Sequence, residues 1–70
     1  MERVLDARGL ACPLPLVKAR ASLPLAPGER LVVLATDPEA PIDIAALAAD
    51  EGLSFAVERD GDYWRLVLSR

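Results

Sequence analysis

The chain has a single cysteine, Cys12, and this is the residue best suited to covalent chemistry. Pro13-Leu14-Pro15 follows it directly, where the first helical pattern begins. Proline is favoured in the first turn of a helix, because N–H groups there have no intrahelical partner and its fixed φ suits the helix. A residue before proline is shifted out of the α region. Cys12 is therefore predicted to be an extended, N-cap-like residue.

This placement predicts a reactive thiol. The unpaired N–H groups and the positive dipole end of a helix N-terminus favour thiolate over thiol. We therefore expect the pKa of Cys12 to lie below the ordinary value of about 8.5. Residues 1–30 carry a net charge of +2 and residues 31–70 a net charge of −5. A basic surface around Cys12 would add to the effect, although a merely solvated face explains the asymmetry equally well.

Composition limits the class of protein. Seventy residues that are 53% hydrophobic and 4% aromatic predict one domain, residues 1–70, with an aliphatic core. The net charge of −3 argues against direct binding of nucleic acid. One cysteine and no histidine exclude an internal disulfide, a compact metal site and a Cys-His catalytic pair, so no metal or cofactor is expected.

Localisation follows from what the sequence lacks. It contains no signal peptide and no apolar run of membrane length, so a cytoplasmic protein with no membrane partner is expected. Asn and Gln are both absent, which fits a thermophilic source, and a GC-rich genome would have the same effect.

Hydrophobic periodicity predicts the order β-α-β-α-β-β. Strands are expected at residues 3–6, 31–36, 53–58 and 64–69, and helices at 13–23 and 41–51. A right-handed crossover makes the first two strands parallel, and the final hairpin adds antiparallel pairing. The predicted fold class is α+β, a two-layer α/β sandwich with a mixed four-stranded sheet and both helices on one face. Val32, Leu34 and Val67 would lie on the open face, as a partner or dimer surface or as ordinary scattered aliphatic residues.

The segment around Cys12 resembles a known signature. The run Asp6-Ala7-Arg8-Gly9-Leu10-Ala11-Cys12-Pro13-Leu14-Pro15 is similar, at every fixed position, to the Asp-x-Arg-Gly-x-x-Cys-Pro-x-Pro motif of the TusA/SirA-like sulfur carrier family. The resemblance extends to Pro27-Gly28-Glu29, Asp37-Pro38 and Asp43-Ile44. It covers the whole chain and implies the same two-layer fold.

The resemblance implies that Cys12 carries a persulfide. It would accept sulfane sulfur from a cysteine desulfurase or rhodanese-type donor and pass it to an acceptor protein, as a carrier modified stoichiometrically rather than an independent catalyst. A second thiol nearby would release the sulfur as a disulfide, and the chain has none. Transfer RNA thiolation, molybdenum cofactor synthesis and other sulfur metabolism are the implied destinations. Leu14 stands where members dedicated to tRNA thiolation tend to carry an acidic residue, which favours the other destinations.

Further residues of the signature have expected supporting roles. Arg8 either stabilises the sulfur anion or docks a partner, or it only pairs with Asp6. Gly9 supplies backbone freedom, and Asp37 is a turn or capping residue without a catalytic role. Pro13 and Pro15 hold Cys12 outward, and Lys18 and Arg20 are candidates for partner docking.

Two other functions compete with the carrier. In a regulatory or protein-interaction module, the same surface would bind a partner, and Cys12 would be redox-sensing or structural. A peroxidase or reductase is disfavoured, because it requires a resolving thiol or an acid-base partner and the sequence offers neither.

Overall fold

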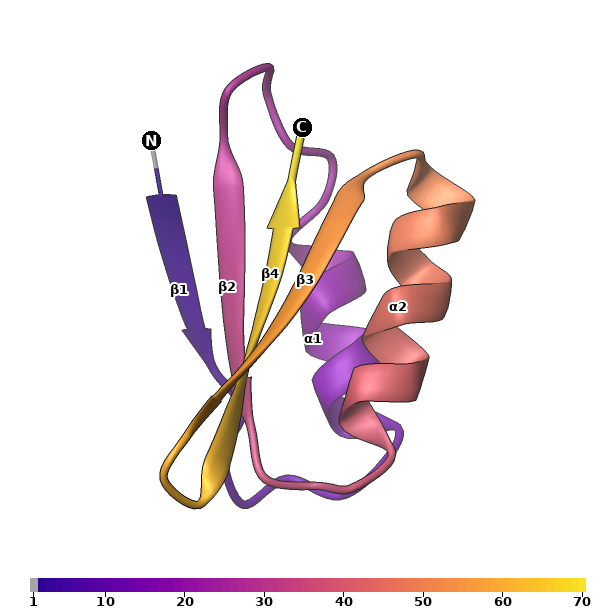
Figure 1. Ribbon diagram of the computed structural model, residues 1–70. Coiled ribbons are helices and arrows are strands. Elements are labelled where there is room, and N and C mark those ends of the chain that lie inside the picture. The colour runs from indigo at the N-terminus through magenta and orange to yellow at the C-terminus, as the bar shows by residue number, and fades with distance from the viewer. Residues whose placement is uncertain (1) are drawn as a thin grey trace.

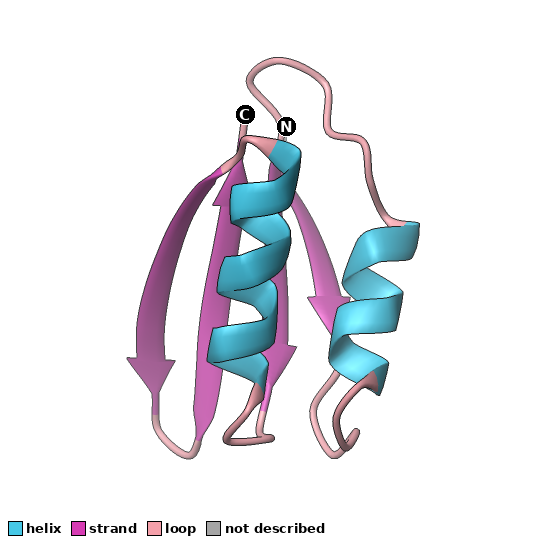
Figure 2. Ribbon diagram, turned by 90° about the vertical axis from the view of Figure 1, so that its right-hand side faces the viewer, coloured by secondary structure: helices cyan, strands magenta, loops and turns pink. Residues whose placement is uncertain are grey.

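The computed structural model describes residues 2–70 and has the predicted two layers, a sheet and a pair of helices (Figure 1). Both helices cover the same face of the sheet, as Figure 2 shows. The α+β fold class is therefore confirmed. In chain order the elements are β1 (Glu2–Asp6), α1 (Leu14–Ala21), β2 (Arg30–Ala35), α2 (Ala40–Glu51), β3 (Ser54–Asp60) and β4 (Tyr63–Ser69).

The four strands form one mixed sheet in the order β1-β2-β4-β3. β1 and β2 are parallel, and β4 runs antiparallel to both β2 and β3. Because β1 and β2 are parallel, the loops that follow them leave the sheet at the same end (Figure 1). This topology brings the β1–α1 loop, which contains Cys12, beside the β2–α2 loop.

The core lies between the sheet and the two helices. On β2 the side chains of Leu31, Val33 and Ala35 are buried against the helices, as the period of two along a strand requires. From α2, Ile44 and Leu47 reach the same cluster. Further members are Ala7, Ala19, Leu25, Ala40, Ala48, Leu53, Leu66 and Leu68.

The start of α1 differs from the prediction. The N–H of Leu14 donates to the carbonyl of Ala11 over 2.9 Å, which closes a turn across Cys12 and a cis Cys12–Pro13 peptide bond. Pro13 is the N-cap of α1, with φ −100° and ψ 20°. The prediction of Cys12 as the N-cap-like residue was therefore wrong by one position, because Pro13 takes the N-cap and Cys12 lies just before it.

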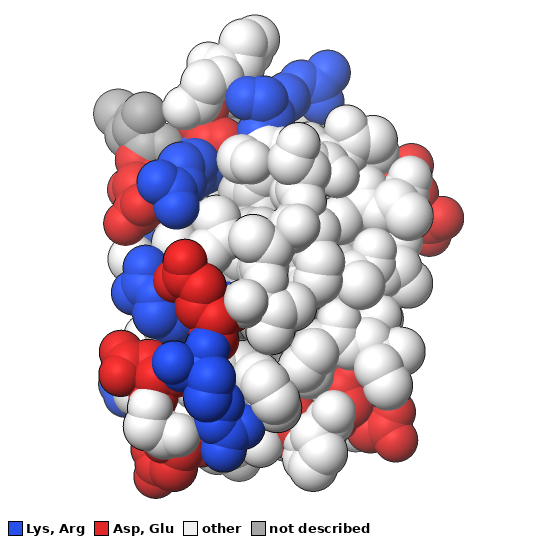
Figure 3. All heavy atoms as spheres, in the orientation of Figure 1, with Lys and Arg blue, Asp and Glu red and all other residues white. Residues whose placement is uncertain are grey.

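The open face of the sheet carries little exposed apolar surface. The cross-strand register places Val4, Val32, Val67 and Ala56 in one row across it. Val32 and Val67 are buried, whereas Val4 is 60% exposed. The neighbouring rows contain the ion pairs Arg30–Glu2 and Arg65–Glu58, and Figure 3 shows charged side chains gathered along the side of the molecule away from α2. Of the two interpretations of this face, an ordinary sheet surface is favoured.

Candidate functional site around Cys12

Cys12 is exposed on the loop between β1 and α1. Its backbone N–H donates a hydrogen bond of 3.0 Å to Oδ2 of Asp37 on the β2–α2 loop. A backbone hydrogen bond to a carboxylate is charge-assisted and stronger than a neutral one. The cysteine backbone is thus held in place while its sulfur faces solvent.

Asp37 connects the cysteine loop to the start of α2. Its other carboxylate oxygen accepts from the N–H of Glu39 over 2.8 Å, and its carbonyl accepts from the N–H of Ala40 over 3.0 Å. Of the two expectations for Asp37, the turn role is therefore confirmed, whereas the N-cap of α2 is Glu39. The contact with Cys12 adds a second role that the sequence analysis missed.

The thiol of Cys12 is directed at Asp43, in the first turn of α2. Sγ lies 3.0 Å from Oδ2 of Asp43, with the thiol donating and the carboxylate accepting. The N–H of Asp43 makes a 3.0 Å hydrogen bond to the carbonyl of Glu39, the first of the α2 ladder. The carboxylate therefore projects from an ordered helical turn. A carboxylate is also the charge that the N-terminus of a helix stabilises.

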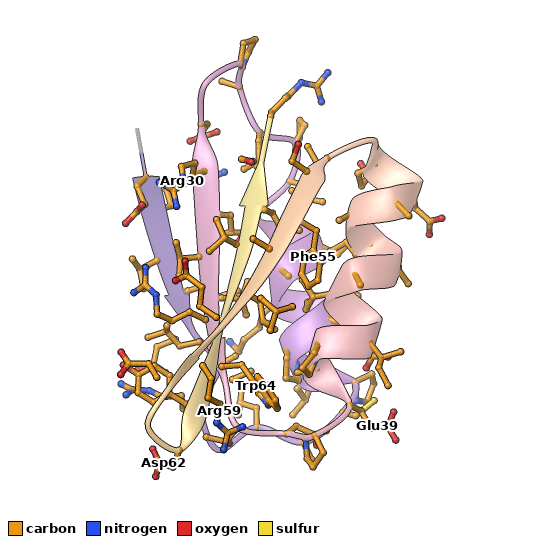
Figure 4. The ribbon with its side chains drawn as sticks, viewed as in Figure 1. Arg30, Glu39, Phe55, Arg59, Asp62 and Trp64 are labelled. Carbon is orange, nitrogen blue, oxygen red and sulfur yellow. The ribbon has the colours of Figure 1, made fainter. Side chains whose placement is uncertain are left out.

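The pKa of Cys12 is raised to about 11, not lowered. The hydrogen bond to Asp43 is the largest cause, because it stabilises the protonated thiol. Partial desolvation and the negative charges of Asp43, Asp37 and Glu39 act in the same direction. Figure 4 shows Glu39 where α2 begins.

The predictions of a depressed thiol pKa and of basic surroundings are therefore wrong. The loop after β2 and the first turn of α2 belong to the acidic part of the chain, and the parallel pairing of β1 with β2 brings them onto the cysteine loop. Their carboxylates raise the pKa of Cys12.

Arg8 makes a fork-like ion pair with Asp6. Nε donates to Oδ1 over 2.9 Å and Nη2 to Oδ2 over 2.8 Å, and the guanidinium lies 4.9 Å from the ring centroid of Tyr63. The side-chain hydrogen bond with Arg8 lowers the pKa of Asp6 to about 2. Among the roles considered for Arg8, the structure shows the pair with Asp6.

The other predicted supporting residues shape the cysteine loop. Gly9 has φ +82°, a conformation that favours glycine, and its N–H donates to Oγ1 of Thr36 over 2.9 Å. Pro13 caps α1, and Pro15 is buried in its first turn. Gly9 and Cys12 thus both bind the segment that follows β2.

The predicted docking residues Lys18 and Arg20 lie in the last turn of α1. Cations there complement the helix dipole, but this is the opposite end of the helix from Cys12. Two large apolar side chains are exposed beside the residues of the thiol contact in sequence: Leu14, two residues after Cys12, at 47%, and Ile42, next to Asp43, at 67%. Ile42 was not predicted as an exposed residue, although its place between Pro41 and Asp43 in the first turn of the expected helix was an available signal.

Two features of the described residues bear on the other expectations. None of the helices in residues 2–70 is long and apolar enough to cross a membrane. Over the same residues, no three side chains of the metal-ligating types come together.

The fold and this site define a small two-layer α+β protein with one exposed thiol on the loop before α1. A SirA-like protein from Desulfitobacterium hafniense has the same fold, with a TM-score of 0.83 at 22% identity over 97% of this chain and 95% of that one. A family model, Sulfurtransferase TusA, matches residues 3–70, and the chain belongs to this family.

Two relatives support the assignment. Sulfur carrier protein TusA of Allochromatium vinosum is 42% identical over 69 residues, which cover 94% of this chain and 91% of the relative. YrkF of Bacillus subtilis is 39% identical over 69 residues, 96% of this chain, but the match spans only 37% of YrkF. The relationship to proteins named as sulfur carriers supports a sulfur carrier role for this chain.

Proposed function

We propose that Cys12 holds sulfane sulfur as a persulfide and passes it from a donor protein to an acceptor protein. The observation that carries the proposal is that the only thiol of the chain is exposed, on a loop that Asp37 fixes by its hydrogen bond to the Cys12 backbone. An exposed sulfur on an anchored loop is accessible to a second protein. The donor is of the cysteine desulfurase or rhodanese type.

The chemistry is an exchange between two sulfur atoms. The Cys12 thiol gives up its proton, and the thiolate attacks the outer sulfur of a persulfide on the donor. The bond between the two donor sulfurs breaks as the new S–S bond forms at Cys12, and the donor cysteine leaves as a thiolate that takes up a proton. No external oxidant or reductant is required, because sulfane sulfur only changes its carrier. Attack by an acceptor thiolate on the outer sulfur at Cys12 then repeats the exchange.

The absence of a second thiol fits this use. A neighbouring cysteine would attack the inner sulfur of the persulfide, form a disulfide and release the outer sulfur as sulfide. The sequence contains no such cysteine, so a persulfide on Cys12 has no intramolecular route of discharge through thiol exchange.

The test is anaerobic incubation of the reduced protein with a cysteine desulfurase and cysteine, followed by intact-mass measurement. The wild-type chain is expected to gain one sulfur atom, and Cys12→Ser none. The matched control is the double variant Cys12→Ser with Ser54→Cys, which moves the single thiol to an exposed position on β3. Equal loading of this control, or no loading of wild type, would contradict the proposal and favour the interaction module.

A further inference from the structure

Cys12 and Asp43 form a donor and acceptor pair that requires a proton on the sulfur. An ionised carboxylate can only accept hydrogen bonds, and Sγ lies 3.0 Å from its Oδ2. If the sulfur were a thiolate, two anions would face each other at this distance without a shared proton. The contact therefore belongs to the neutral thiol, which is the unreactive form of cysteine.

Asp37 is hydrogen-bonded to Cys12 directly and connected to Asp43 through Glu39. Asp37 accepts the N–H of Cys12 through Oδ2 and the N–H of Glu39 through Oδ1. The carbonyl of Glu39 accepts the N–H of Asp43. One short chain of hydrogen bonds thus fixes the thiol and its carboxylate relative to each other, and the pair is a built feature of the two loops.

The cations of residues 1–30 are either paired with carboxylates or lie at the far end of α1. Arg3 pairs with Glu29, and Arg30 pairs with Glu2. Arg8 is bound to Asp6 by two side-chain hydrogen bonds, and Lys18 and Arg20 lie at the far end of α1. The charged groups that act on Cys12 from α2 and the loop before it are all carboxylates: Asp43, Asp37 and Glu39. None of these interactions favours a thiolate in the free protein.

We propose that Asp43 is a positioning residue that holds Cys12 as a neutral, weakly reactive thiol while the protein is free. Sulfur exchange then requires a cationic group of the donor protein to neutralise or displace this carboxylate. The thiol proton passes to solvent or to a base of the donor as the thiolate forms. The physiological role of Asp43 rests on the proposed function, because it matters only if Cys12 exchanges sulfur.

The test is the rate of alkylation of Cys12 by iodoacetamide, a neutral reagent, as a function of pH. A fall in the pKa of Cys12 from about 11 to about 9 raises the thiolate fraction at pH 7 by about 100-fold, and the lower basicity of that thiolate returns about a factor of 10. Asp43 is the largest contributor but not the only one. Asp43→Ala is therefore expected to react about fivefold to tenfold faster than wild type at pH 7, with its pH profile shifted to lower pH.

Three variants separate the contact from the charge. Asp43→Asn keeps an acceptor oxygen without the charge and is expected to lie between wild type and Asp43→Ala. Glu39→Gln removes a nearby charge without the contact and should accelerate alkylation less than Asp43→Ala. Asp50→Asn removes an exposed charge at the far end of α2 and should leave the profile unchanged.

Several results would overturn the role of Asp43. Slower alkylation of Asp43→Ala would make it an activating base, and an unchanged profile would leave it without influence on the thiol. An equal effect of Glu39→Gln or Asp50→Asn would assign the effect to net charge. The alkylation assay contains no sulfur donor and is therefore independent of the loading assay. Failure of wild type to load sulfur would overturn the proposed function and leave the alkylation result standing.

The cationic requirement has its own measurement. Added triarginine peptide should accelerate alkylation of wild type and have a smaller effect on Asp43→Ala, with triglycine peptide as the uncharged control. Equal acceleration of the two proteins, or none of wild type, would contradict the requirement for a cation at Asp43.

Discussion

The sulfur of Cys12 lies 3.0 Å from the carboxylate of Asp43, although 31 residues separate them in the chain. The parallel pairing of β1 with β2 creates this proximity, because it brings the loops that precede α1 and α2 to one end of the sheet. The contact favours the protonated thiol, which is the opposite of the reactivity expected from the sequence.

The first prediction concerns the titration of Cys12. Its pKa of about 11 means that the thiol stays protonated through neutral pH and ionises only in strong alkali. The alkylation rate should rise about tenfold per pH unit from pH 7 to about 10 without a plateau. A short unstructured peptide with one cysteine is the control and should level off near pH 9. The prediction would be contradicted if the alkylation rate of the protein levelled off at the same pH as that of the peptide, or at a lower pH.

The second prediction concerns Asp37, which accepts backbone N–H groups from two segments. Asp37→Ala leaves both groups without this acceptor and should lower the free energy of unfolding by about 1 kcal/mol. Urea denaturation followed by circular dichroism measures the change. Asp37→Asn keeps one acceptor oxygen and should lose less, and Asp50→Ala should be near neutral. Equal stability of Asp37→Ala and wild type would show that these hydrogen bonds add nothing to folding.

The third prediction concerns Asp6 and Arg8. Arg8 lowers the pKa of Asp6 to about 2 in the folded protein, so the pair favours folding above the unfolded pKa of about 3.9. This contribution is lost as pH falls from about 4 towards 2, and it is small because the pair is exposed. In a carboxyl NMR titration, Arg8→Ala should move the Asp6 midpoint towards its ordinary value. Arg8→Lys, which lacks the fork, should move it part of the way. An unchanged midpoint in Arg8→Ala would rule out the pair as the cause.

The fourth prediction tests whether Gly9 acts through its backbone alone. A Cβ at this position would meet no atom within 4 Å, but φ is +82°. Gly9→Ala should therefore destabilise the fold by about 1 kcal/mol through backbone strain. Gly9→Asn should cost less, because asparagine enters this region more readily. If the alanine variant were as stable as wild type in urea, the backbone argument would fail.

Much of the fold could be predicted from local patterns. The continuous apolar run of residues 31–35 indicated a central strand, and Gly52 marked the end of α2 at a left-handed residue of φ 68°. These features follow from properties of residues close in sequence. The position of Cys12 relative to α1 was missed by one residue, because Pro13 rather than Cys12 is the N-cap and a turn closed by Leu14 and Ala11 precedes the helix.

The chemistry of the site could be predicted only in part. The sequence identified the thiol, whereas its pKa depends on Asp43 and Asp37, which reach Cys12 only through tertiary structure. A signal was available, since Asp37 follows the strand that was expected to pair in parallel with the one before Cys12. Carboxyl ends of parallel strands meet at one edge, so this carboxylate could have been placed beside the cysteine.

The most direct test of the central claim is discharge of a loaded Cys12. The protein is loaded with labelled sulfur from a cysteine desulfurase, separated from the enzyme and treated with cyanide, which takes up sulfane sulfur as thiocyanate. The account predicts one labelled thiocyanate for each loaded protein and the return of the protein to its unmodified mass. Cys12→Ser is expected to release no labelled thiocyanate. Labelled sulfur that stays on the protein, or that is released equally from the serine variant, would contradict a persulfide carried on Cys12.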